Sequence, residues 1–216
     1  MTREPADQAQ EADRAQREVT TSRRRFVATV GVAAAGLTAV TAGQSVGLLD
    51  GFNLFGPRTR RDSPQQVPIN RTAAAAAVEP AASDPAWALR LTGASTRALS
   101  RQDLLDLPQT TVRLPIACVE GWSVQAQWTG VRVRDLMGLV GVSAGATVRL
   151  TSLEPQGVYR STDLGSEFVA APTTLVALAL NGETLSLDHS YPARLIAPNR
   201  PGVLQTKWLS TIEVLP

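Results

Sequence analysis

Short apolar runs bounded by glycine, proline or asparagine dominate the chain from Val67 to Pro216, and they do not alternate regularly with helical segments. A chain built from parallel β-α-β units would show such an alternation. The run 174–180 instead leads directly into Asn181–Gly182, a dipeptide that favours a tight β-hairpin. These features predict an α+β fold that is mostly β.

Local patterns set the expected boundaries of the elements. A helix is expected to begin at Ser100, where Ser-Arg-Gln-Asp resembles a capping box, and to end before Pro108. A second helix is expected over 131–140, where apolar residues recur at helical spacing and Gly141 follows. The predicted strands are 87–91, 110–116, 124–128, 147–152, 174–180, 194–197 and 208–214.

The sequence of the N-terminal part indicates a targeting segment. Ser22-Arg23-Arg24-Arg25-Phe26 precedes a run of Ala, Gly, Thr and Val, and this resembles the twin-arginine signal by which bacteria export folded proteins. Arginines also precede ordinary signal peptides and membrane anchors. We therefore expect an exported, cell-envelope protein, periplasmic or extracytoplasmic, that is either released or anchored to the cytoplasmic membrane. The expected division is a polar tail at 1–21, a signal or anchor at 22–49, a linker at 50–66 and one folded domain at 67–216.

Composition excludes several classes of protein. Lys plus Arg number 21 against 19 Asp plus Glu, which is not the balance of a nucleic-acid binder. His189 is the only histidine, so a zinc site built from several imidazoles is excluded. No glycine-rich phosphate-binding motif is present, and a nucleotide cradle therefore has no support. If a transition metal binds, an organic cofactor must supply most of its ligands.

Cys118 is the only cysteine, so the chain cannot form an internal disulfide. By itself such a thiol is explained by buried packing, by an intermolecular link, or by a role as ligand or nucleophile. A metal-free thiol enzyme would need a nearby base, yet no thiol-hydrolase motif surrounds Cys118 or His189.

Two segments resemble the molybdopterin-binding catalytic domain of the sulfite oxidase and bacterial exported molybdopterin oxidoreductase superfamily. Leu114-Pro-Ile-Ala-Cys118-Val-Glu120-Gly-Trp122 is similar to the molybdenum-cysteine motif of that family. Residues 188–198, with Lys207-Trp208-Leu209, are similar to its pterin-phosphate segment. The resemblance covers about 67–216 and implies a sulfite-oxidase-type molybdopterin-binding fold, preceded by the signal or anchor segment.

The resemblance also implies roles for individual residues. Cys118 would be a catalytic residue and the thiolate ligand of molybdenum, an ion for which a soft sulfur ligand is suitable. Glu120 would be a second catalytic residue that handles protons, with a salt bridge at the pocket rim as the alternative. The positions that match cofactor-binding residues are Asn70, Arg71, Cys118, His189, Arg194 and Lys207. Apart from the resemblance, an oxyanion or sulfoxide needs hydrogen-bond donors near the metal. Candidates for this role are Arg132, Tyr159, Arg160 and Arg200, with ordinary surface side chains as the alternative.

The function implied is that of a molybdenum-molybdopterin-dependent oxidoreductase. It would transfer an oxygen atom with two electrons at a Cys-ligated molybdenum, on a sulfoxide- or sulfite-like substrate that is a small molecule or part of a protein. A separate electron-transfer partner, a cytochrome or a quinone-linked membrane protein, is expected. The alternative from another class is a metal-free, membrane-tethered β-rich binding module with the same fold.

Overall fold

The computed structural model describes residues 28–32, 64–117, 122–143 and 145–216. The chain divides into two compact units, Met1–Gly56 and Pro57–Pro216. In the first unit the described residues 28–32 are helical and exposed. No helix among the described residues is both long and apolar enough to cross a membrane. Apart from 28–32, the predicted signal or anchor segment lies outside the described residues.

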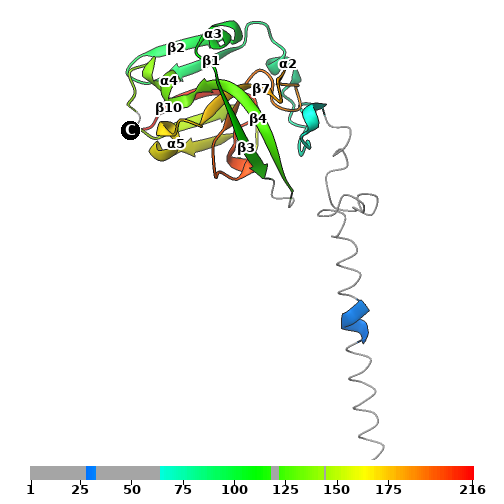
Figure 1. Cartoon of the computed structure of the whole chain (residues 1–216). Helices are drawn as coiled ribbons and strands as arrows, with labels where there is room; N and C mark the ends of the chain where they lie inside the picture. Colours follow the sequence, from blue (N-terminus) through cyan, green and yellow to red (C-terminus); the bar gives the residue numbers. More distant parts are fainter. Residues whose placement is uncertain (1–27, 33–63, 118–121, 144) are drawn as a thin grey trace, which may run out of the picture. The chain divides into compact units, whose positions relative to one another are not determined.

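The strands of the second unit form two sheets (Figure 1). Sheet A has the order β2-β1-β10-β5-β6, and sheet B has the order β3-β4-β7-β8, with β9 also paired to β7. The described pairings are antiparallel except for the parallel pair β1 and β10. The strands are β1 (Ala88–Thr92), β2 (Thr96–Ser100), β3 (Thr110–Ala117), β4 (Ser123–Arg132), β5 (Val148–Ser152), β6 (Ser161–Leu164), β7 (Leu175–Leu180), β8 (Glu183–Thr184), β9 (Arg194–Ile196) and β10 (Leu209–Val214).

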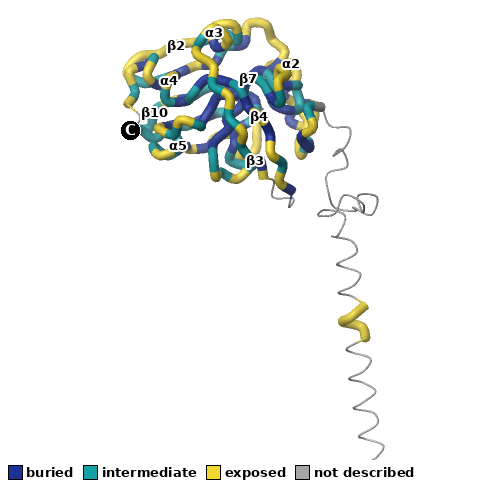
Figure 2. The backbone as a smooth tube through the Cα atoms, viewed as in Figure 1, coloured by how far each residue is buried: buried dark blue, intermediate teal, exposed yellow. Residues whose placement is uncertain are grey.

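Strand β7 lies between two hydrophobic clusters, and all but one of its residues are buried (Figure 2). Val176 and Leu178 belong to a cluster shared with β1, β5 and β10 of sheet A. Leu175 and Ala177 belong to a second cluster that contains Val67, together with β3, β4 and β9 residues. Because successive side chains of a strand point to opposite faces, this apolar run covers both faces of sheet B. The second cluster borders the candidate site.

Short helices connect the strands. In α3 (Arg101–Asp106) the Ser100 hydroxyl accepts from the Asp103 amide, and the Asp103 carboxylate accepts in return from the Ser100 amide. This reciprocal capping box satisfies two amide groups that would otherwise lack partners at the helix start. The other helical elements are η2 (Pro64–Gln66), α2 (Glu79–Ala82), α4 (Val133–Gly138), α5 (Ser166–Ala170) and η3 (Gly202–Leu204).

The prediction of an α+β, mostly β fold is confirmed, and the differences concern the bounds of some elements and a few short elements that were not predicted. The helix expected over 131–140 spans only 133–138, because Val131 and Arg132 continue β4 and pair with Val176 and Leu175. Strands β2 and β6 and helix α5 were not predicted. β2 is exposed over most of its length and β6 has four residues, so neither gives a strong apolar pattern.

The long hairpin β3–β4 positions the candidate site. Its register pairs residues continuously from Thr110 with Gly130 to Ala117 with Ser123. At Gly130 the β4–β7 register shifts, and a Cβ there would overlap the carbonyl oxygen of Val176, so glycine permits the close approach. At its other end, the two strands of the hairpin are joined by a connection of five residues, 118–122.

Candidate functional site

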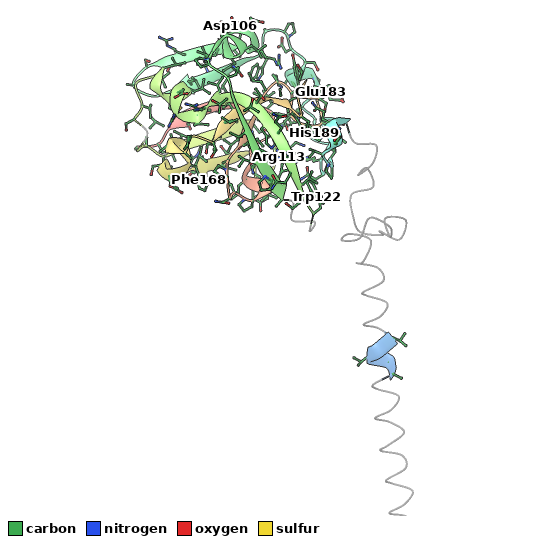
Figure 3. All side chains as sticks on the ribbon, in the orientation of Figure 1. Asp106, Arg113, Trp122, Phe168, Glu183 and His189 are labelled. Carbon is green, nitrogen blue, oxygen red and sulfur yellow. The ribbon has the colours of Figure 1, made fainter. Side chains whose placement is uncertain are left out.

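A pocket with about 410 Å³ of space free of protein atoms lies where the β3–β4 hairpin ends. Figure 3 shows two of its residues, Trp122 and His189, on the same side of the domain. Its described lining residues are Val67, Pro68, Ile69, Asn70, Ile116, Ala117, Trp122, Asp188, His189, Arg194, Gly202 and Lys207.

Arg194 is the most deeply buried cation of the pocket. It begins β9, it is only 3% exposed, and its guanidinium carbon lies 5.0 Å from the ring centre of Trp128. Its Nε makes no hydrogen bond, and within the described part of the chain Arg194 forms no ion pair. Burial lowers the pKa of this guanidinium to about 10. A buried charge without a counter-ion is costly, which suits a position that receives an anionic ligand.

Lys207 supplies a second cation to the same pocket. Its ammonium donates to the carbonyl oxygen of Arg71 at 2.7 Å and lies 4.1 Å from the ring centre of Trp208. Burial, and then the positive charge of Arg194, lower the pKa of Lys207 to about 7. An anion bound between Arg194 and Lys207 would relieve this repulsion and hold Lys207 protonated.

His189 and Asp188 enter the pocket from the segment between β8 and β9. The His189 amide donates to the Ser186 carbonyl at 3.0 Å, and His189 is 2% exposed. One Asp188 carboxylate oxygen accepts from the Ala73 amide at 2.8 Å. Ser190, which follows, has a positive φ of 83°. This tight turn brings His189 and Arg194, five residues apart in the chain, to one cavity.

Four of the six predicted cofactor-binding residues line the pocket, namely Asn70, His189, Arg194 and Lys207. Cys118 and Glu120 lie outside the described residues, although Ala117, the residue before Cys118, lines the cavity. The Arg71 side chain does not line it, because its guanidinium forms an ion pair with Glu154 at 2.8 Å. Arg71 contributes instead through the carbonyl oxygen that binds Lys207.

The candidate donors to a substrate oxygen are not among the described pocket residues. Arg132 lies 4.0 Å from the Asp135 carboxylate, and Tyr159 is exposed. Arg200 donates to the carbonyl oxygens of Leu204 and Asp163. Arg132 and Arg200 thus have partners within the protein, and the substrate-side assignments stay predictions.

The sequence did not single out the wall formed by Val67, Pro68 and Ile69, or the position of Asp188 in the cavity. Asp188 belongs to the pterin-phosphate-like segment, so its neighbours His189 and Arg194 could have indicated it. The wall residues precede the part of the chain with clear strand patterns, and nothing in their sequence marks them.

The donor set fits one kind of ligand. Two cations, one of them buried with an unpartnered Nε, favour a phosphate-sized anion, while the apolar wall accommodates an organic ring system. No group of three His, Cys, Asp or Glu side chains able to hold a metal occurs among the described residues. The fold and the pocket thus define a mostly β domain that binds an anionic organic cofactor.

Comparison with known proteins identifies the family. Residues 75–216 match the family described as "oxidoreductase molybdopterin binding domain", and the chain belongs to that family. It is a molybdopterin-binding domain of the sulfite oxidase type, its cofactor is molybdenum-molybdopterin, and it is of the oxidoreductase class.

Three relatives illustrate the range of the family. A sulfite oxidase of Arabidopsis thaliana is 27% identical over 164 residues, covering 60% of this chain and 42% of that protein. An uncharacterized oxidoreductase, YuiH, of Bacillus subtilis is 33% identical over 116 residues, covering 53% and 57%. A putative protein-methionine-sulfoxide reductase subunit, YedZ1, of Azospira oryzae is 28% identical over 118 residues, covering 54% and 44%.

A solved structure supports the fold. The sulfane dehydrogenase SoxCD from Paracoccus pantotrophus superposes with a TM-score of 0.54 at 22% identity, covering 60% of this chain and 38% of that one. The chain spans about half the length of the curated relatives it matches.

Proposed function

We propose that this chain is the catalytic domain of an exported bacterial molybdenum enzyme that transfers an oxygen atom to or from a sulfoxide- or sulfite-like substrate. The relatives named as a sulfite oxidase and as a putative methionine sulfoxide reductase subunit support the two substrate classes. When bound, the cofactor supplies the two-electron redox chemistry. The protein residues bind it, orient it and manage protons.

The observation that carries the proposal is the pair of cations in the pocket. Arg194 and Lys207 have lowered pKa values because of burial, and they line one cavity with His189. In our proposal these three side chains hold the phosphate of the pterin, and Asn70 provides an amide for the ring system. Charge-assisted hydrogen bonds of this kind are stronger than neutral ones.

The metal ligand in the proposal is the Cys118 thiolate. Ala117 and Trp122 line the pocket on either side of the segment that carries Cys118, and this short connection supports the assignment. Glu120, two residues further on, is proposed to exchange the protons that accompany oxygen-atom transfer. Both roles follow the match to the molybdenum-cysteine motif.

Export and electron transfer complete the proposal. The twin-arginine-like sequence at 22–26 suits a protein that receives its cofactor before export, and the segment up to 49 would be a signal or a membrane anchor. Electrons would pass to or from a separate cytochrome or quinone-linked membrane protein. Fractionation of cells that carry Arg23 and Arg24 replaced by lysine tests the export route: the precursor should stay in the cytoplasm.

Metal analysis decides the central point. The protein is purified from a host that makes molybdenum cofactor, molybdenum is measured by mass spectrometry, and the pterin is measured by fluorescence after oxidation. We expect near-stoichiometric amounts of both. A folded, metal-free protein with an alkylatable Cys118 would instead support the tethered binding module.

Replacing Cys118 by serine separates ligation from cofactor binding. The Cys118→Ser variant should retain the pterin, because Arg194, Lys207 and His189 remain, but should lose oxygen-atom transfer by at least about a thousandfold, ~4 kcal/mol. X-ray absorption at the molybdenum edge should show one sulfur ligand fewer. Normal turnover by this variant would overturn the thiolate assignment.

A further inference from the structure

The pocket wall formed by residues 67–70 is held by hydrogen bonds of the residues that flank it on both sides. Val67, Pro68, Ile69 and Asn70 are four consecutive lining residues, and Val67 is 1% exposed within the second hydrophobic cluster. On the C-terminal side the chain is held by Lys207, which donates to the Arg71 carbonyl, and by Asp188, which accepts from the Ala73 amide. Both of those contacts involve residues of the pocket.

The N-terminal side is held by a different kind of contact, centred on Gln65. Its side-chain amide nitrogen lies 3.3, 3.3 and 2.9 Å from the carbonyl oxygens of Leu180, Glu183 and Thr184. Its side-chain oxygen accepts from the Ser186 amide at 3.0 Å. One half-buried side chain thus spans the turn between β7 and β8 and the start of the segment that leads to His189.

Asn181 completes this set of contacts. Its side-chain nitrogen donates to the Gln65 carbonyl oxygen at 2.7 Å, and its side-chain oxygen accepts from the Gln127 amide of β4 at 2.9 Å. The β7–β8 turn is therefore tied to sheet B on one side and to Gln65 on the other. Gln65 is therefore connected to strands β7 and β8 directly and to β4 through Asn181.

The backbone at this point is in a conformation that costs free energy. Gln65 and Gln66 have φ values of 62° and 60°, in the left-handed region that residues other than glycine avoid. Such a residue persists only where surrounding contacts hold it. The side-chain contacts of Gln65 supply that hold, and without them the backbone would relax and the wall would lose its position.

We propose that Gln65 is a positioning residue, a latch that keeps the wall 67–70 closed over the cofactor pocket, and that cofactor loading and release require this latch to open. The latch lies outside the pocket lining, so it acts through the wall and not by touching the ligand. The inference rests on the cofactor pocket of the proposed function, and it adds the route by which the ligand enters and leaves.

Two substitutions test the latch. Gln65→Ala removes all the side-chain contacts, while Gln65→Glu keeps the size and the acceptor for Ser186 but places a carboxylate against three carbonyl oxygens. Gln102→Ala and Gln102→Glu are the matched controls, because Gln102 makes one exposed hydrogen bond, to Asp106, within α3.

Hydrogen exchange of the apoprotein is the first readout. In both Gln65 variants the backbone amides of 67–73 should exchange hydrogen at least about tenfold faster than in wild type. This corresponds to a decrease of ~1.4 kcal/mol in the free energy of local opening. Exchange in β4 and β7 should match wild type, which shows that the domain is folded. Wild-type exchange at 67–73 in both Gln65 variants would overturn the proposal.

Release of the cofactor is the second readout. Loaded protein is mixed with an excess of an unrelated apo-molybdoenzyme as a trap, and the pterin that remains bound is followed by fluorescence after oxidation. Both Gln65 variants should lose pterin about tenfold faster than wild type, and the Gln102 variants should not. Faster exchange without faster release would overturn the gating role. If wild-type protein takes up no pterin, the proposed function fails, while exchange at 67–73 still decides whether Gln65 latches the wall.

Discussion

Two arginines, one on each sheet, show how differently this domain uses the same charge. Arg149 of sheet A is exposed and forms two hydrogen bonds, of 2.7 and 2.9 Å, to the Asp163 carboxylate of the neighbouring strand. Arg194 of sheet B is buried and has no carboxylate partner among the described residues. The charge of Arg149 has its counter-ion within the protein, whereas the charge of Arg194 is left for a ligand to neutralise.

The pKa values follow the same division. The hydrogen bond from Arg149 lowers the pKa of Asp163, and the same bond raises the pKa of Arg149. Burial lowers the pKa values of Arg194 and Lys207 instead. A pair of matched charges stabilises both charged forms, while burial destabilises the charged forms of Arg194 and Lys207, and the charge of Arg194 adds to this effect on Lys207.

Among the changes that test this comparison, removal of the buried charge should have the largest effect. Arg194→Met should weaken cofactor binding by roughly 10- to 150-fold, the effect of one charge-assisted contact of ~1.5–3 kcal/mol. The apoprotein should be as stable as wild type or more stable, because a buried unmatched charge is replaced by an apolar side chain of similar length. Molybdenum occupancy and urea unfolding of the apoprotein measure the two effects. Strong destabilisation of the apoprotein together with full occupancy would make Arg194 a structural residue like Arg149.

An intermediate effect is expected from pH. The pKa of Lys207 is about 7 in the folded domain, against 10.5 for an unperturbed lysine, so between these values the unfolded chain binds more protons. The apoprotein should therefore become more stable as pH rises from 7 to 9, which urea unfolding at several pH values would show. In Lys207→Met this contribution should disappear. An identical slope in wild type and variant would show that Lys207 keeps an ordinary pKa.

The smallest effect should follow loss of the exposed pair. Arg149→Ala should lower the thermal midpoint by no more than about 2 °C, because exposed ion pairs contribute little to stability. Molybdenum occupancy should equal that of wild type. A clear loss of cofactor in this variant would abolish the distinction between the two arginines.

The sequence predicts the fold class, and it predicts site residues that the structure places near one another. His189, Arg194 and Lys207 lie in motifs whose spacing matches a known family, and the structure brings all three to one cavity. The apolar strand β7 was predicted correctly because its pattern is strong. Short or exposed elements such as β2 and β6 were missed, since tertiary pairing rather than their own sequence makes them strands.

The role of Gln65 could not be predicted from sequence patterns. Its contacts join it to carbonyl oxygens more than a hundred residues away in the chain, and its left-handed backbone is unusual for glutamine. For Arg71, the sequence suggests a role, and the structure adds contacts that the sequence does not indicate. The resemblance to the family predicts it as a cofactor-binding residue; in the structure its side chain pairs with Glu154, and its carbonyl oxygen accepts a hydrogen bond from Lys207.

The parallel pairing of β1 with β10 has a consequence for biosynthesis. β10 lies between β1 and β5 in sheet A, so the strand synthesised last in this domain occupies a central place in the sheet. The pocket likewise needs both the wall at 67–70 and Lys207. A nascent chain that stops before Lys207 lacks both β10 and part of the pocket lining, and pairings this distant in sequence form slowly. We therefore expect the cofactor to be captured late in maturation, after Lys207 and β10 have been translated.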